Sequence, residues 1–149
     1  MSSSFVRHLT PLLVAILLAG CQTIESKNRQ ASLEKVLHAY ETAIRWSYIR
    51  HAYNLMRPER VKEIGIPQGL ENIKVTRYEV LAPAVSNPKS NTATQVALIN
   101  YVEKDRQQEK SLTDHQLWEY DSQAKRWYLI SDIPAFVVRP RMRAMPPSR

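Results

Sequence analysis

The sequence is poor in the residues that build disulfide frameworks and phosphate-binding loops. Its 149 residues include one cysteine and three glycines. One cysteine forms no disulfide within the chain, and three scattered glycines make no glycine-rich loop around a phosphate group. A G-x-S-x-G nucleophile motif is absent as well. These absences exclude a disulfide-stapled scaffold, a nucleotide-binding loop of this kind and a hydrolase elbow.

Metal ligands are equally scarce. After the N-terminal apolar segment the chain has His38, His51 and His115. No two of them are four residues apart, the spacing that places two ligands on one helical face. We therefore predict no metal site and no cofactor.

The sequence also lacks an apolar run long enough to span a bilayer. The apolar segment near its N-terminus covers residues 9–19, which is eleven residues, whereas a spanning helix needs about 20. Arg7 precedes this segment, small residues close it, and polar Gln22 and Glu25 follow. This layout is typical of a secretory signal peptide, which we predict over residues 1–20.

Excess positive charge is missing from the central part of the chain. Residues 31–133 carry 14 Lys and Arg against 13 Asp and Glu, whereas residues 134–149 carry four Arg and no acid. A nucleic-acid-binding domain is expected to have a basic face on its folded part. We therefore predict one nearly neutral domain over residues 31–133, and no nucleic-acid partner.

The motif Leu18-Ala19-Gly20-Cys21 resembles the lipobox of bacterial lipoproteins. The resemblance implies that the sulfur of Cys21 is acylated, as by palmitate, and that the mature chain begins there. Residues 21–30 would then form the lipidated cysteine and a short tether. Because Gln22 rather than an aspartate follows the cysteine, the resemblance implies an anchor in the outer membrane, facing the periplasm. A cleaved signal without lipid is the alternative.

Residues 134–149 contain prolines and arginines without apolar periodicity, and we expect a disordered tail. Its arginines either remain solvated or contact anionic lipid or lipopolysaccharide. Deletion from Phe136 onward is expected to change the thermal midpoint little. The arginines concerned are Arg139, Arg141 and Arg143.

Helical periodicity dominates the first part of the predicted domain. An apolar stripe predicts a helix over residues 32–46 with Ser32 as its N-cap. The stripe changes phase near Ser47, which predicts a break and a second short helix. The two stripes consist of Leu33, Val36, Leu37, Tyr40, Ala43, Ile44 and Ser47, and then of Trp46, Ile49, Tyr53 and Met56.

β-Forming residues dominate the second part, in four segments. They predict strands over residues 73–82, 92–104, 111–121 and 126–131, separated first by a turn-rich segment over residues 83–91. In the first strand the apolar phase switches from Ile73 and Val75 to Tyr78, Val80 and Ala82, which predicts a bulge near residues 76–77.

Cross-strand chemistry suggests the register of two hairpins. Pairing Asp121 with Arg126 places Tyr120 opposite Trp127 and Trp118 opposite Leu129, and we expect this aromatic face to point toward the helices. A turn at Gln107 and Gln108 would pair oppositely charged residues. That second register places Arg106 opposite Glu109, Asp105 opposite Lys110, Tyr101 opposite Asp114 and Ala97 opposite Trp118.

This order of elements, closing with residues 116–120 and 125–129, resembles the cystatin-like and nuclear-transport-factor-2-like α+β folds. Residues 40–47 and the segment to Pro58-Glu59 also resemble the helical opening of uncharacterised bacterial lipoproteins. The resemblance implies an N-terminal helix pair packed on a curved four-stranded antiparallel sheet.

Some relatives of that fold enclose a pocket and catalyse proton transfer, which needs a carboxylate in an apolar cavity. Here Tyr101, Asp114, Gln116 and Trp118 are the candidate pocket residues. The competing interpretation is a buried carboxylate satisfied by a tyrosine, with the aromatic residues serving as core. No residue is assigned a catalytic role.

The function expected from these features is a membrane-anchored interaction or scaffold lipoprotein of the bacterial envelope, with envelope proteins as its partners. The alternatives are a small-ligand or lipid binder that uses a cone-shaped pocket and, behind it, an isomerase-like or cyclase-like enzyme. A filled interior would favour the first.

Overall fold

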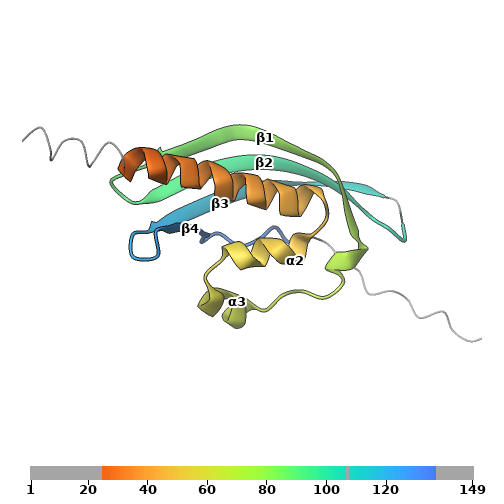
Figure 1. Ribbon diagram of the computed structural model, residues 1–149. Coiled ribbons are helices and arrows are strands. Elements are labelled where there is room, and N and C mark those ends of the chain that lie inside the picture. The colour runs from red at the N-terminus through yellow and green to blue at the C-terminus, as the bar shows by residue number, and fades with distance from the viewer. Residues whose placement is uncertain (1–24, 107, 137–149) are drawn as a thin grey trace, which may run out of the picture. The chain divides into compact units, whose positions relative to one another are not determined.

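The computed structural model describes residues 25–106 and 108–136. Helices come first and an antiparallel sheet follows, which is an α+β arrangement (Figure 1). The helical elements are a helix over residues 25–45, α2 (Ile49–Ala52), the 3-10 turn η1 (Tyr53–Leu55), α3 (Pro58–Ile64) and the 3-10 turn η2 (Leu70–Asn72). The strands are β1 (Ile73–Asn87), β2 (Thr92–Glu103), β3 (Glu109–Asp121) and β4 (Arg126–Leu129).

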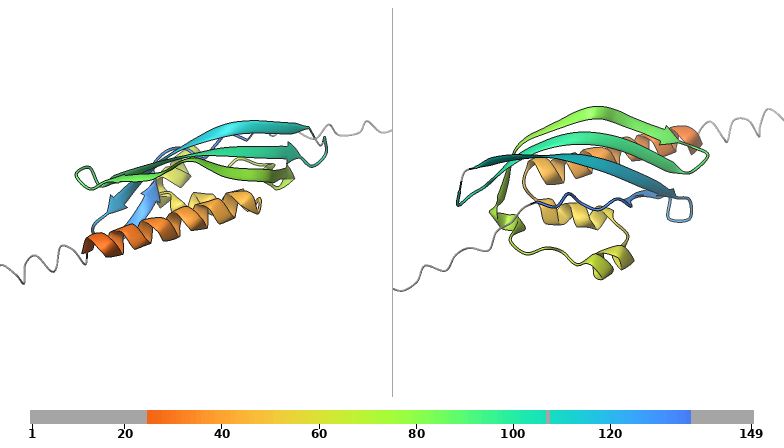
Figure 2. Two further views of the ribbon diagram at one scale, coloured as in Figure 1. Left: turned by 90° about the horizontal axis from the view of Figure 1, so that it is seen from above. Right: turned by 180° about the vertical axis from the view of Figure 1, so that it is seen from behind.

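The four strands form one open sheet in the order β1-β2-β3-β4, each antiparallel to its neighbour. The described residues fall into two units that divide after residue 35, and the sheet belongs to the second unit. Figure 2 shows that β1, β2 and β3 are long and curved, with the helix from residue 36 onward lying across their concave face. The sheet therefore has an inner face, which packs on helices, and an outer face.

The predicted apolar stripe of the first helix is confirmed in most of its positions. Tyr40, Ala43 and Ile44 are buried, as is Leu33, whereas Val36 and Leu37 are half-buried. Their spacing of three and four residues keeps them on one side of the helix.

The predicted start of this helix is wrong. Ser32 does not cap it, because residues 25–30 are already helical. The Ser32 hydroxyl instead donates to the carbonyl oxygen of Arg29 at 2.7 Å, within the helix. A serine can satisfy its hydroxyl inside a helix in this way, so a serine before an apolar stripe does not by itself mark a helix start. Residues 25–30, which belong to the predicted tether, are helical.

The predicted break near Ser47 is confirmed, and α2 is the expected second short helix. Ser47 has a φ of 63°, a left-handed conformation that stops the helix. Ile49, Tyr53 and Met56 are buried as predicted. Trp46 was expected to be buried with them and is exposed, because the reversal at Ser47 directs the chain away from the helical phase that the stripe assumed.

The bulge in β1 is also confirmed, since the register with β2 shifts between Val75 and Arg77. Tyr78 is buried as expected, but Val80 and Ala82 are exposed. Residues 83–87, predicted as part of a turn, continue the strand. Pro83 fits there because β1 is an edge strand with a further register shift between Ala82 and Val85, where a missing N–H disrupts no ladder.

The predicted register of β3 with β4 is confirmed: Asp121 pairs with Arg126, Tyr120 with Trp127 and Trp118 with Leu129. One carboxylate oxygen of Asp121 accepts the N–H groups of residues 123 and 124 at 2.9 Å, which shapes the turn. Trp118, Trp127 and Leu129 are buried, whereas Leu117 is exposed. The aromatic set therefore faces the helices, as predicted.

The predicted register of β2 with β3 is wrong by four residues. Tyr101 pairs with Lys110 instead of Asp114, and Ala97 pairs with Asp114 instead of Trp118. The charge pairs that suggested the earlier register are not formed: Asp105 accepts a hydrogen bond from Asn72. Exposed ion pairs contribute little to stability, so burial decided the register. A shift of four keeps each residue on its expected face, since faces alternate every residue.

The folded part continues past the expected boundary at residue 133. Ile133 and Phe136 are buried, and the Phe136 ring lies edge-on to Tyr101 with centroids 5.1 Å apart.

None of the helices among the described residues has the length and apolar character needed to cross a bilayer.

Candidate functional site

The candidate pocket residues lie on the inner face of the sheet, Tyr101 on β2 and the other three on β3. Asp114, Gln116 and Trp118 alternate along β3 and therefore point to the same side. All four side chains are buried, and Asp114 is 2% exposed. Tyr101 lies farther along the sheet, beside Phe136 rather than opposite Asp114.

Asp114 receives two hydrogen bonds, both on its oxygen Oδ2. The hydroxyl of Tyr40, from the first helix, donates at 2.9 Å, and the side-chain amide of Gln116 donates at 2.9 Å. Tyr40 and Asp114 are 74 positions apart in the sequence. A buried carboxylate is costly without such donors, so this pair ties the helix to the middle of the sheet.

Gln116 connects the carboxylate to two aromatic residues. Its Nε2 also donates to the Tyr78 hydroxyl at 2.9 Å, and its Oε1 accepts from the Trp118 indole at 3.2 Å. The Trp118 ring meets the Tyr40 ring edge-on at 5.7 Å between centroids. We call these five residues, Tyr40, Tyr78, Asp114, Gln116 and Trp118, the inner polar cluster.

Burial shifts the ionisation of this cluster toward neutral forms. It raises the pKa of Asp114, although the hydrogen bonds from Tyr40 and Gln116 oppose that rise. Burial, with the nearby Asp114 carboxylate, also raises the pKa of Tyr40 well above its usual value. Burial likewise raises the pKa of Tyr78. A low-polarity environment disfavours the charged form of each group.

A buried carboxyl group with a raised pKa is a feature that general acid–base catalysis also uses. Catalysis further requires that a reacting atom come within hydrogen-bond reach of that group. Here Oδ2 is held by Tyr40 and Gln116, and both ends of the Gln116 amide are engaged. The hydrogen bonds of the cluster therefore join helix and sheet, and they satisfy its buried polar groups, as is usual in folded proteins.

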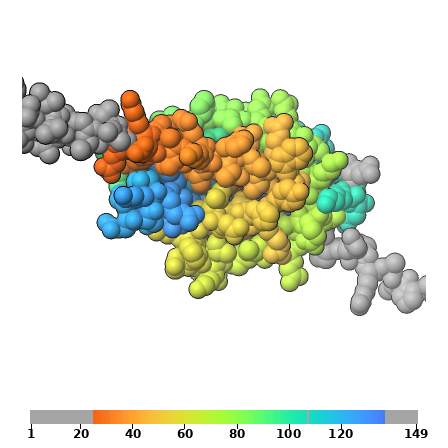
Figure 3. All heavy atoms as spheres, viewed as in Figure 1, coloured from red at the N-terminus to blue at the C-terminus, as the bar shows by residue number. Residues whose placement is uncertain are grey.

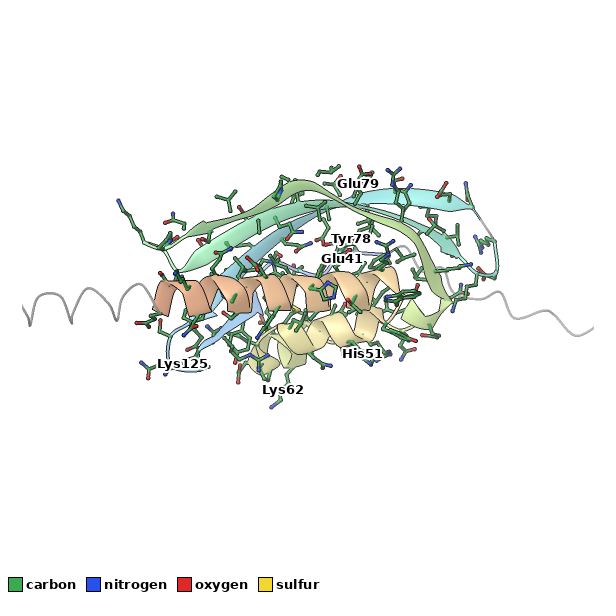
Figure 4. The ribbon with its side chains drawn as sticks, turned by 45° about the horizontal axis from the view of Figure 1, so that its top comes forward. Glu41, His51, Lys62, Tyr78, Glu79 and Lys125 are labelled. Carbon is green, nitrogen blue, oxygen red and sulfur yellow. The ribbon has the colours of Figure 1, made fainter. Side chains whose placement is uncertain are left out.

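The views with atoms agree with this arrangement. Figure 4 shows Tyr78 on the side of β1 that faces the helix, with Glu79 on the opposite side. On the face of the molecule in Figure 3, atoms of the helix from position 36 onward, of α2 and of α3 lie outermost.

A partly buried ion pair forms a second inner-face feature, at the C-terminal end of β2. Glu103 is almost fully buried and pairs with Lys110 of β3. Lys110 takes the place opposite Tyr101 that the sequence analysis gave to Asp114. The charges of this pair satisfy each other across the strands, so we assign it a structural role.

Periodicity did not identify Tyr40 and Tyr78 as members of the inner polar cluster, and nothing in the sequence marked Glu103 as buried. Tyr40 and Tyr78 were assigned to the core by periodicity, and each carries a hydroxyl that needs a partner when buried. This requirement predicts that each hydroxyl forms a hydrogen bond, but it does not identify the residue at the other end of the bond. Glu103 carried no signal, because a charged residue near a strand end is usually exposed.

In the described parts of the chain, no group of three or more His, Cys, Asp or Glu residues is placed to hold a metal ion. Cys21 and the three tail arginines, Arg139, Arg141 and Arg143, lie outside the described residues.

No family model, curated protein or solved structure matches this chain.

Proposed function

We propose that the chain is a membrane-anchored, non-catalytic interaction or scaffold lipoprotein of the bacterial envelope. The observation that carries the non-catalytic part is the inner polar cluster, whose groups bond to one another beneath the helix. A ligand at the same place would have to separate Tyr40, Gln116 and Trp118. This requirement favours the scaffold over the ligand-binding and enzymatic alternatives.

The anchoring part of the proposal rests on Leu18-Ala19-Gly20-Cys21. Acyl chains on Cys21 bind the bilayer with about 0.8 kcal/mol for each buried methylene group. Gln22 after the cysteine supports an outer-membrane, periplasm-facing location. Envelope proteins are the proposed partners, with no nucleic acid, and the tail arginines add a contact with anionic lipid or lipopolysaccharide.

We further propose that the domain is cystatin-like or nuclear-transport-factor-2-like. The order of helices before a curved four-stranded antiparallel sheet supports this assignment. In such a domain, specificity for a partner resides on the outer surface when the concave face is filled by side chains.

Fractionation of cells that express the Cys21→Ser protein tests the anchor. The variant is expected to lose acyl label and leave the membrane fraction, because it lacks the sulfur that carries the lipid. The unchanged protein, washed in high salt, is the control. A serine variant that still sediments with membranes after this wash would refute the lipoprotein assignment.

The location is tested separately with Gln22→Asp. This variant keeps Cys21 and should keep its acyl label, but it is expected to move from the outer to the inner membrane. A labelled Gln22→Asp protein that stays with the outer membrane would contradict the sorting argument and leave the anchor intact.

A further inference from the structure

We propose that the turn formed by Trp46, Ser47 and Tyr48, here called the aromatic turn, docks on the anionic phosphate headgroups of the bilayer that holds Cys21. This inference rests on the proposed function, because the anchor supplies the nearby membrane. It adds a second, orienting contact that the anchor alone does not provide.

The aromatic turn exposes two large side chains that a folded domain normally covers. Trp46 is 67% exposed and Tyr48 is 61% exposed. Tryptophan and tyrosine combine an apolar ring with a polar hydrogen-bonding group, and they are enriched where a protein meets the headgroup layer of a membrane.

The backbone of the aromatic turn is held in place. Ser47 adopts a φ of 63°, and its hydroxyl oxygen accepts the N–H of Val75, at the edge of the sheet, at 2.9 Å. The N–H of Trp46 donates to Thr42 at 3.1 Å, and the carbonyl of Tyr48 accepts from His51 at 2.7 Å. A rigid turn loses little conformational entropy on binding, which favours docking through its side chains.

The charge around the aromatic turn suits an anionic surface. Residues 42–58 include Arg45, Arg50 and Arg57 but no Asp or Glu. Arg45 has an exposed ion pair with Glu41 at 3.6 Å, which is weak enough to exchange for a phosphate. Arg50 forms no ion pair within the described parts of the chain.

Arginine donates in a fork that matches phosphate oxygens. His51 adds a polar ring that stacks on Tyr48, with centroids 5.6 Å apart. Arg57 is engaged elsewhere, with Glu119 and Asp121. Within residues 42–58, the cationic groups available to lipid phosphates are therefore Arg45 and Arg50, which flank the two aromatic residues in the sequence.

A protein partner is the competing occupant, since exposed tryptophan, tyrosine and arginine are also typical of protein interfaces. The tether favours the bilayer. A lipid-anchored domain meets headgroups at high effective concentration, so even a weak contact is populated.

The fluorescence of Trp46 provides a direct test, because it is the one exposed tryptophan of three; Trp118 and Trp127 are buried. The mature lipidated protein is placed in vesicles that contain brominated phosphatidylglycerol, whose bromine atoms quench fluorescence at short range. We expect quenching of an exposed tryptophan component, weaker quenching with brominated phosphatidylcholine, and loss of that component in Trp46→Phe.

A matched control moves the tryptophan to another exposed position. Val85 is 68% exposed, near the end of β1. In the Trp46→Phe, Val85→Trp protein the new ring is as exposed as Trp46, and we expect it to escape the quencher. Equal quenching at both positions would show nonspecific contact and overturn the proposal.

Charge reversal tests the cationic part. We expect Arg50→Glu to lower the quenching of Trp46 at least twofold at low salt, where electrostatic attraction is least screened. Lys125→Glu makes the same charge change at the β3–β4 turn, which Figure 4 shows far from His51 along the domain, and should leave the quenching unchanged.

Two further results would overturn the proposal: Trp46 unquenched in every vesicle and not shielded by an added protein, or Trp46 unquenched in vesicles but shielded when a purified envelope protein is added. The second would assign the aromatic turn to a protein partner. Both are distinct from failure of the anchor, which appears as loss of acyl label and of vesicle association.

Discussion

The hydroxyl group of Tyr40 links the first helix to the sheet through a hydrogen bond. Tyr40 lies on an apolar stripe, yet its hydroxyl donates to the buried Asp114 carboxylate. Removing one partner of a buried hydrogen bond leaves the other without its bond, at a cost of about 1 to 3 kcal/mol. The five side chains of the inner polar cluster therefore depend on one another for their hydrogen bonds and ring contacts.

Tyr40→Phe should therefore lower the free energy of unfolding by about 1 to 3 kcal/mol at neutral pH. The ring and its contact with Trp118 remain, so the loss reports the hydroxyl. Tyr48→Phe removes an exposed hydroxyl and should change stability by under about 0.5 kcal/mol. Chemical denaturation measures both, and equal effects of the two variants would contradict the assigned role of Tyr40.

The pH dependence of stability should carry the signature of Asp114. Burial raises its pKa in the folded state, so folding favours the protonated form. The contribution of this group is most favourable below its unfolded pKa, about 3.9, and falls as the pH rises through the higher folded value.

Asp114→Asn removes that titration. Both donors use the single oxygen Oδ2, so one amide oxygen can accept the same two bonds. Relative to the unchanged protein, the variant should gain stability as the pH rises from about 3.5 to 7. Unfolding curves at several pH values measure the difference, and a difference that is constant with pH would refute the buried-carboxylate account.

At the scale of elements, burial outranks surface charge in setting strand register. The β3–β4 register follows an apolar and aromatic face, and the sequence predicted it correctly. The β2–β3 register was predicted from exposed charge pairs and is displaced by four residues. Asp105, Glu109 and Lys110 each found other partners, which are Asn72, Thr76 and Glu103.

The face assignment predicts unequal costs for neighbouring aromatic residues. Trp118→Ala should lower stability by about 3 to 5 kcal/mol, because the ring is fully buried against Tyr40. Tyr128→Ala should cost clearly less, because that ring is only half-buried, on the opposite face of β4 from Trp127 and Leu129, where it contacts the guanidinium groups of Arg57 and Arg126. A larger loss in Tyr128→Ala would contradict the sheet orientation.

For the whole molecule, the C-terminal boundary of the fold lies later than composition suggested. Composition separated a neutral domain from a basic tail at residue 133, yet Phe136 packs on Tyr101. Phe136 is the third residue of a segment rich in proline and arginine, and the composition of that segment does not mark it as buried. Its contact with the Tyr101 ring does.

Two truncations that differ by one residue test this boundary. A chain that ends at Ala135 should lose about 2 to 4 kcal/mol of stability, the range for removing a buried phenylalanine. A chain that ends at Phe136 keeps the ring and should retain most of that stability. Thermal unfolding compares the two, and equal midpoints would restore the earlier expectation that deletion from Phe136 is harmless.

Features that depend on neighbours along the chain could be predicted from the sequence alone. The apolar stripe of the first helix, the break at Ser47, the bulge near Thr76 and the β3–β4 hairpin follow from short-range periodicity, turn chemistry and the pairing of adjacent strands. The predicted lipobox is equally local, and it remains a prediction that the Cys21→Ser experiment tests.

Which distant residues share an environment depends on how the helices and the sheet pack. That packing joined Tyr40 to Asp114 across 74 positions, placed Phe136 on Tyr101 and left Trp46 in solvent, none of which periodicity predicts. A polar group that is expected to be buried must have a hydrogen-bond partner, but which residue is that partner depends on how helix and sheet pack. Packing is set by the summed burial of many side chains, and no short stretch of sequence contains that sum.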